Sequence, residues 1–117
     1  MDTLTRVRAS CLRLPEAGER MSHGSPTFFV RAKKSFAVYV DGGYHEPGPT
    51  LWCPAPEGVQ EELIDTEPER FFVPPYVGHS GWIGVRLDVD ADWDEIDAII
   101  RDGYRRVAPK KLVAQLD

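Results

Sequence analysis

The sequence lacks any apolar run of the roughly 18 to 20 residues that a membrane-spanning helix requires. Its first residues, Met1 to Arg8, do not contain the apolar centre of a secretory signal peptide. We therefore expect a cytoplasmic protein that does not associate with a membrane. Cysteine is scarce too, since the only two are Cys11 and Cys53. This scarcity excludes a disulfide-stapled miniprotein, and we expect both residues to be buried or idle thiols.

Loops and clusters that bind phosphates or metals are also missing. The chain contains neither Gly-x-Gly-x-x-Gly nor Gly-Lys-Ser/Thr, which cradle phosphates in nucleotide-binding proteins. No pair of His or Cys residues has the close spacing of a zinc site. We therefore expect no cofactor and no metal. The 117 residues, 42% hydrophobic and 28% charged, are ordinary for one globular domain and exclude a disordered chain.

Positive charge is in deficit overall, but it is unevenly distributed. The chain has 14 Lys and Arg against 19 Asp and Glu, a net charge of −5, which argues against a strongly basic nucleic-acid-binding protein. The net charge is +4 over residues 1–40, −12 over residues 41–97 and +3 over residues 98–117. If the two basic ends meet in the fold, they form one positive face on an acidic protein. Otherwise the ends and the middle attract each other, or each charge is simply solvated.

Apolar residues at helical spacing, bounded by prolines, predict three helices and a short fourth one. The first follows a cap at Asp2 or Thr3. The third follows Asp92, with Glu95 reaching back to the backbone as in a capping box. The first helix is expected to end at Pro15. The second begins at residues 54–57 and ends at Pro68. The third ends at Pro109, and the short fourth helix spans residues 110–116.

Apolar residues at alternate positions predict five strands, at residues 27–31, 36–40, 50–53, 71–73 and 82–87. Short connections make the first two and the last two antiparallel hairpins, the first with a basic tip. The stretch from Glu19 to Pro26 is polar and turn-rich and is expected to be a connection. The whole chain, residues 1–117, is thus predicted to be one two-layer α+β domain. Its five-stranded antiparallel sheet carries helices on one face, in the order α-β-β-β-α-β-β-α with a short final helix.

Several segments together resemble the MmcQ/YjbR-like family. The segment SHGSPTFFVR at residues 22–31, followed by KSFA at 34–37, is similar to the family's His and Pro before a strand and its Phe-Ala opening the next. The segment YVGHSGWIGVRL at 76–87 is similar to its Gly-Trp strand. DWDE at 92–95 and YRRVAPKKL at 104–112 resemble its C-terminal helices. The resemblance covers about residues 4–113.

The resemblance implies a compact α+β domain, described for that family as a double-wing DNA-binding fold and also likened to secretion chaperones. The predicted order of helices and strands agrees with it. No shared catalytic motif comes with the resemblance, so no catalytic residue is transferred to this chain.

Basic side chains near the first hairpin tip and the C-terminus are the candidate nucleic-acid-binding residues, because Lys and Arg neutralise phosphates and release counterions. Tyr39, Tyr44, Trp52 and Tyr104 could add base stacking if exposed. The alternative is a solvated hairpin and ordinary cations at a helix C-terminus. The candidate cations are Arg31, Lys33, Lys34, Arg101, Arg105, Arg106, Lys110 and Lys111.

A second candidate site is a shallow groove for a peptide or a small anion, lined by His23, Tyr39, Trp82 and Arg86. His23 could also act as a general base beside Ser25 in an enzyme. However, no Gly-x-Ser-x-Gly motif surrounds Ser25, and no carboxylate is spaced to orient the imidazole. The structural alternative is that the His23 ring bonds to backbone.

Residues and resemblance together predict a non-enzymatic cytoplasmic module that binds the phosphate backbone of nucleic acid non-specifically, as a monomer or homodimer. The alternative is a chaperone-like module that binds another protein through an exposed sheet face. A third possibility is a small-molecule-binding protein or enzyme with His23 in a pocket.

Overall fold

The computed structural model describes residues 2–43, 46–87 and 91–116. Within these ranges, no helix has the length and apolar character needed to cross a bilayer. The elements follow one another as α1 (Thr3–Leu12), β1 (Ala17–Ser22), β2 (Ser25–Val30), β3 (Lys34–Asp41), β4 (Pro49–Cys53), α2 (Val59–Thr66), β5 (Phe71–Phe72), η1 (Gly78–Ser80), β6 (Ile83–Arg86), α3 (Trp93–Val107), α4 (Lys110–Val113) and η2 (Ala114–Leu116).

The strands form one antiparallel sheet in the order β1-β2-β3-β4-β6-β5. The α+β class and the two predicted hairpins are confirmed, but the prediction of five strands is wrong because the sheet has six. The segment expected to be a connection contains most of β1, an edge strand that pairs with β2. An edge strand needs little apolar content, and β1 (AGERMS) contributes only half-buried and exposed residues. The described residues also form the 3-10 helix η1, which was not predicted, and the predicted final helix at 110–116 consists of α4 followed by the 3-10 helix η2.

The turn between β1 and β2 explains why this hairpin forms from so polar a segment. Ser22 and Ser25 face each other, which leaves a two-residue loop of His23 and Gly24. Both loop residues have positive φ, 52° and 81°. Two consecutive positive-φ residues are typical of the tight turn whose twist matches a β-hairpin.

Side-chain caps begin the two long helices where expected. The Asp2 carboxylate accepts a hydrogen bond from the Thr5 amide at 2.7 Å, and the Asp92 carboxylate accepts from Glu95 and its neighbour at 3.3 and 3.0 Å. The second half of the predicted capping box is wrong. The Glu95 side chain instead accepts a hydrogen bond from Arg70 at 3.1 Å, which ties the start of α3 to the segment before β5.

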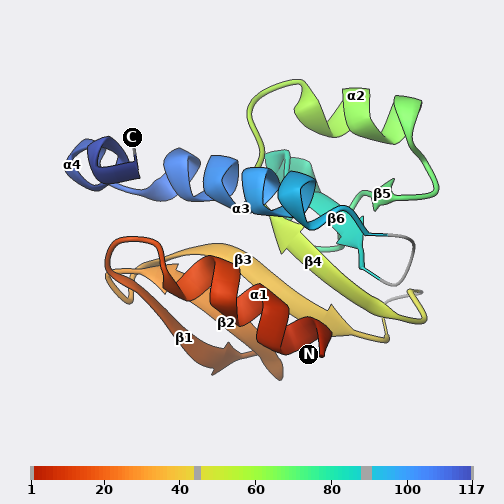
Figure 1. The fold of residues 1–117 in the computed structure, drawn as a ribbon. Coiled ribbons are helices and arrows are strands. Elements are labelled where there is room, and N and C mark those ends of the chain that lie inside the picture. Colours follow the sequence, from red (N-terminus) through yellow and green to blue (C-terminus); the bar gives the residue numbers. More distant parts are fainter. Residues whose placement is uncertain (1, 44–45, 88–90, 117) are drawn as a thin grey trace.

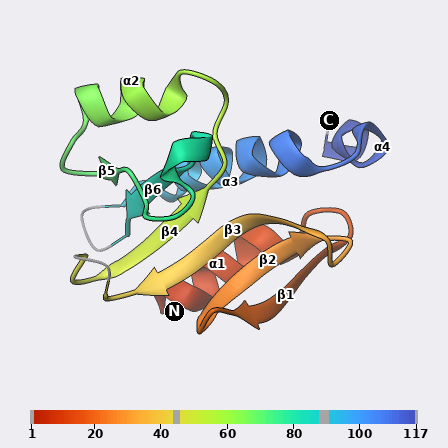
Figure 2. The same cartoon turned by 180° about the vertical axis from the view of Figure 1, so that it is seen from behind.

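Helices α1 and α3 lie side by side across one face of the sheet (Figure 1). The core lies between them and the sheet, and its fully buried side chains include Val7, Phe28, Phe36, Leu51 and Ile100. Seen from behind, β2 and β3 have no helix in front of them, while the loop containing η1 lies in front of β4 (Figure 2). The sheet therefore has one covered face and one open face.

Candidate nucleic-acid interface

The predicted cations come from two separate parts of the chain. Lys33 lies in the turn between β2 and β3, Arg31 precedes it, and Lys34 begins β3. The remaining five lie in the last turns of α3 and in α4, and all but one are exposed. They are Arg101, Arg105, Arg106, Lys110 and Lys111.

The fold brings these two parts to the same end of the molecule. The C-terminal half of α3 crosses the beginning of β3 so closely that a Cβ on Gly103 would lie 3.2 Å from the Phe36 carbonyl oxygen. One residue later, the buried Tyr104 donates a hydrogen bond to the Pro15 carbonyl at 2.5 Å, in the loop between α1 and β1. The β2–β3 turn, the last turns of α3 and α4 lie at one end in both ribbon views (Figures 1 and 2). We call this region the basic end, and it comprises the eight predicted cations.

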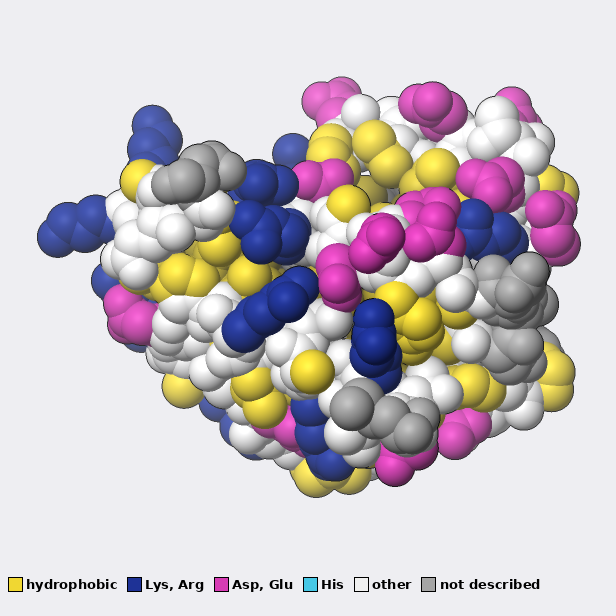
Figure 3. Space-filling model, in the orientation of Figure 1, with side chains coloured by type: hydrophobic (Ala, Val, Ile, Leu, Met, Phe, Trp, Pro, Cys, Tyr) yellow, Lys and Arg dark blue, Asp and Glu magenta, His cyan; other side chains and the backbone are white. Residues whose placement is uncertain are grey.

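Charges of opposite sign separate across the helix-covered face. In Figure 3, Lys and Arg side chains gather around α4 and the C-terminal half of α3, whereas Asp and Glu gather around α2 and the N-terminal half of α3. The acidic cap of α3 and the acidic first turn of α2 contribute to the negative side. An overall acidic molecule thus presents one predominantly positive region.

Local partners neutralise some of the predicted cations. The guanidinium of Arg31 pairs with Glu16 at 3.0 Å, and that of Arg105 pairs with Asp102 at 3.1 Å. Arg101 donates to a backbone carbonyl of η2 at 3.0 Å. By contrast, the four lysines of the basic end make no ion pair within residues 2–43, 46–87 and 91–116. These lysines are Lys33, Lys34, Lys110 and Lys111.

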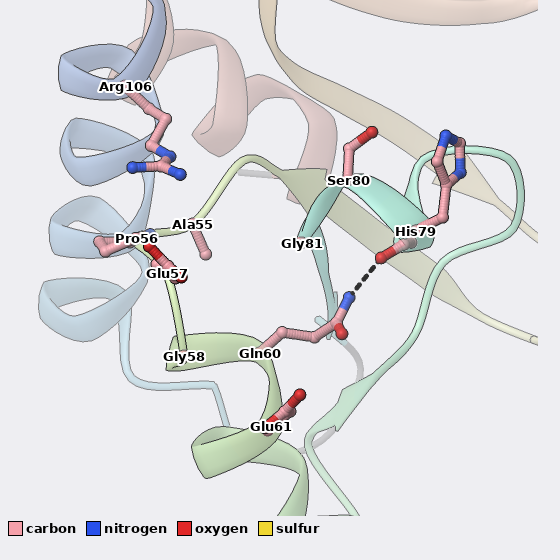
Figure 4. Close-up of a pocket in the computed structure, with 11 residues that line it drawn as sticks. Ala55, Pro56, Glu57, Gly58, Gln60, Glu61, His79, Ser80, Gly81 and Arg106 are labelled. Atoms are coloured by element: carbon pink, nitrogen blue, oxygen red, sulfur yellow. Dashed lines mark hydrogen bonds between the residues drawn. The ribbon is translucent and has the colours of Figure 1, made fainter.

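Arg106 lines a hollow of about 380 Å³ between α3, the start of α2 and η1 (Figure 4). Two carboxylates, Glu57 and Glu61, also line this hollow. The Gln60 side chain closes one wall by donating to the backbone carbonyls of Gly78 and Trp82 at 2.8 and 2.7 Å. Because both signs of charge line it, this hollow is poorly suited to hold a phosphate.

The aromatic residues proposed for stacking are not available as a platform. Tyr39 and Trp52 are each 7% exposed and Tyr104 is fully buried, while Tyr44 lies outside the described residues. The Tyr104 ring packs edge-on against Phe36, with ring centroids 5.4 Å apart. Base stacking on these side chains is therefore not supported by their positions.

The predicted groove is not assembled from the four residues named for it. Tyr39 belongs to the core on the helix-covered face. Arg86 is bound by Glu46 at 2.7 and 3.0 Å, and Trp82 is half-buried near Gln60. Only His23 lines a groove, a hollow of about 620 Å³ on the open face. His23 is exposed and its ring makes no hydrogen bond within the described residues, so the structural alternative of a bond to backbone is wrong.

Arg6 and Arg8 of α1 and its C-cap residue Arg13 were not among the predicted site residues, and two of them, Arg6 and Arg13, contact α3. Arg8 pairs with Glu19 at 2.8 Å, Arg13 pairs with Asp97 at 3.3 Å, and Arg6 lies 5.2 Å from the Trp93 ring centroid. The seven-residue spacing of Arg6 and Arg13, which places them on one helical face, was the available signal.

Burial determines the protonation state of the two cysteine thiols. Cys11 and Cys53 are both buried and free, as the sequence predicted. Desolvation raises the pKa of each thiol above its ordinary value, and for Cys11 the neighbouring Cys53 adds to the effect. Both groups are therefore held as neutral thiols in the core. Among the described residues, no three His, Cys, Asp or Glu side chains gather to hold a metal ion.

Comparison with known proteins identifies the family. The chain is similar over its whole length to the crystal structure of the Deinococcus radiodurans protein DR2400, which contains a DUF419 domain. The two share 18% sequence identity with a TM-score of 0.78, over 99% of this chain and 88% of that one, which shows a common fold. None of the curated proteins compared with the chain matches it. The family model for YjbR matches residues 12–106, and the chain therefore belongs to the YjbR family.

Proposed function

We propose that this protein is a non-enzymatic binding module that holds the phosphate backbone of nucleic acid against its basic end, without reading the base sequence. The observation that supports the proposal most strongly is the juxtaposition of the β2–β3 turn with α4 and the last turns of α3. Four lysines, which make no ion pair within the described residues, belong to these segments at one end of the molecule. Ammonium groups of this kind neutralise phosphates as point charges.

The rest of the molecule restricts how a nucleic acid can approach. On the face shown in Figure 3, the acidic surface around α2 and the beginning of α3 repels phosphates, which favours contact at the opposite, basic end. The resemblance noted above points the same way, because the fold of that family is described as a double-wing DNA-binding fold. Readout of bases is not part of the proposal, because buried Tyr39, Trp52 and Tyr104 leave the basic end without these aromatic side chains.

Salt dependence is the direct test. Fluorescence anisotropy with labelled random-sequence duplex and single-stranded DNA measures the dissociation constant over a series of salt concentrations. If each of the four lysines contacts one phosphate, log K falls with log salt concentration with a slope of about −4 for the duplex. Absence of binding in low salt at about 50 µM protein, within the range typical of non-specific complexes, would refute the proposal.

Single charge-removing variants locate the contacts. Lys34→Gln and Lys111→Gln each reduce the magnitude of the slope by about 1 if the lysine contacts a phosphate. Arg6→Gln is the matched control, because it also removes one exposed positive charge but lies beside Trp93, at the other end of α1 and α3. An equal loss of slope in all three variants would indicate attraction by net charge alone and would contradict a defined interface.

The chaperone-like alternative requires an exposed apolar surface. In the described residues, the large apolar side chains with the greatest exposure are Leu12, Met21, Val73 and Tyr76. They come from α1, β1 and the segment after β5, not from one element, so we favour the phosphate proposal. Capture of a discrete protein partner that resists nuclease treatment would reverse that preference.

A further inference from the structure

The groove on the open sheet face has an apolar floor. The strand register places Val38 opposite both Thr27 and Trp52, so these side chains share one face of the sheet. Together with Phe29 and Val40 they border the hollow of about 620 Å³. This volume lies in the range of small-molecule sites, which are typically apolar with a few polar groups at the rim.

Two residues on the rim have unusual backbone conformations. His23 in the β1–β2 turn has φ 52°, and Tyr76 in the loop after β5 has φ 68°. The two-residue hairpin turn accounts for the conformation of His23, whereas a bulky residue such as Tyr76 rarely adopts this region, and such positions concentrate at ligand sites. Tyr76 is 74% exposed although it is a large aromatic residue, and it lines the groove. Hydroxyl groups complete the rim, from Ser22, Ser25 and Ser35.

The charge beside the groove is positive. No Asp, Glu, Lys or Arg is among the described residues that line it. Arg20 lies next to it, with its guanidinium carbon 3.8 Å from the centroid of the Phe29 ring. Arg20 uses one N–H to donate a hydrogen bond to the Ala32 carbonyl at 3.1 Å. Within the described residues, Arg20 forms no ion pair with a carboxylate. A guanidinium carries five N–H donors and recognises carboxylates well.

We propose that this groove binds a small aromatic carboxylate. The aromatic ring lies on the floor formed by Val38 and Trp52, and the carboxylate lies toward Arg20 and the hydroxyl rim. A positive neighbour and the absence of carboxylates in the described lining favour an anion over a cation. The apolar floor favours a ring over a sugar or a free phosphate. The described residues that line the groove include none of the eight cations of the basic end, so the two proposed sites are distinct, and Arg20 is connected to the β2–β3 turn through its hydrogen bond to Ala32.

Three ligands of the same shape and different charge test the chemistry. Titration with 3-phenylpropionate, 3-phenylpropanol and 3-phenylpropylamine, followed by ¹H–¹⁵N NMR, reports the site through the Trp52 indole resonance and the amides of β2 and β3. We expect the carboxylate to bind about tenfold more tightly than the alcohol (about 1.4 kcal/mol), and the amine to bind most weakly. No shift of these resonances at millimolar carboxylate, or equal binding of amine and carboxylate, would overturn the proposal.

Two variants test separately how the apolar floor and the Arg20 charge contribute to ligand binding. Arg20→Gln removes the preference for the carboxylate over the alcohol and leaves alcohol binding unchanged. Val38→Phe places a ring in the groove and abolishes binding of all three ligands. Met21→Phe adds the same ring at an exposed position of β1, on the opposite side of the sheet from Arg20, and leaves binding unchanged. If Val38→Phe does not fold, the ligand series on wild type and Arg20→Gln decides the question.

Other occupants give different results in the same experiments. If a second copy of the chain covers the groove, the Trp52 and β2–β3 resonances shift with protein concentration alone, and sedimentation detects a dimer. If an apolar peptide segment is the ligand, the three phenyl compounds bind equally and Arg20→Gln has no effect. Either result would overturn the proposal.

Discussion

Replacing Gly103 with alanine tests how firmly α3 is held against the sheet. A Cβ at this position would lie 3.2 Å from the carbonyl oxygens of both Phe36 and Pro54. Both contacts are backbone atoms, one in β3 and one just after β4, so neither can move without moving its strand. Overpacking of this kind destabilises by about 1–3 kcal/mol, while alanine in a helix interior gains about 1 kcal/mol over glycine. The steric effect is therefore expected to win, with a net loss of about 1 kcal/mol.

Urea unfolding followed by tryptophan fluorescence measures this difference in the free energy of unfolding. Ala98→Gly, at an exposed position of the same helix, is the matched control and isolates the helix-propensity contribution, a loss of about 1 kcal/mol. Thermal unfolding should show Gly103→Ala melting lower by about 4 °C. A gain in stability for Gly103→Ala, equal and opposite to the control, would refute the reasoning. It would mean that α3 shifts freely and that its close approach does not define the basic end.

Four further measurements follow from the core and the caps. Tyr104→Phe removes the hydrogen bond to Pro15 and should lower the free energy of unfolding by about 1 kcal/mol. A loss below about 0.3 kcal/mol would show that this bond contributes nothing net. Burial, followed by the nearby Glu16, raises the pKa of Tyr104 above 10, so its contribution is complete below pH 10 and is lost as the pH rises through the folded pKa. Urea midpoints between pH 9 and 11 should therefore fall more steeply for wild type than for Tyr104→Phe, and parallel curves would contradict this. Asp92→Ala should cost about 1 kcal/mol through loss of the α3 cap, whereas a change within error would show that the cap is replaced by water. A thiol reagent should modify neither cysteine in the native protein and both in denaturant, because both are buried; rapid native labelling would show that the core opens.

The local elements of this fold were predictable because their causes are local. Asp2 and Asp92 were identified as caps from residue type and position, and both make the expected hydrogen bonds. The β5–β6 hairpin and the final helix also follow from short-range pattern. Strand β1 was missed because an edge strand buries little and therefore carries little apolar pattern. The consecutive His23 and Gly24, which form the β1–β2 turn, were the feature of the sequence that could have indicated this hairpin.

The sequence could not show which side chains of each strand point toward the helices, and the candidate groove was misplaced for that reason. Strand β3 has apolar residues on both faces, so alternation alone does not say which set is inside. The structure buries Ala37 and Tyr39 under the helices and directs Val38 to the open face. An irregularity in the β2–β3 register after Phe28 contributes to this arrangement, because an extra residue reverses the facing of the side chains that follow it.

The amino-acid sequence by itself determined the α+β class, the helix caps, the β2–β3 and β5–β6 hairpins, the buried thiols and the separation of basic ends from an acidic middle. These properties depend on residue type, on periodicity and on neighbours a few positions away. Only the tertiary structure decided that the β2–β3 turn lies beside the end of α3, and that the open face carries a groove floored by Trp52 and Val38. Both arrangements depend on contacts between distant segments, such as Gly103 against Phe36. Such contacts are set by how the helices and the sheet pack as whole bodies, and no short stretch of sequence encodes them.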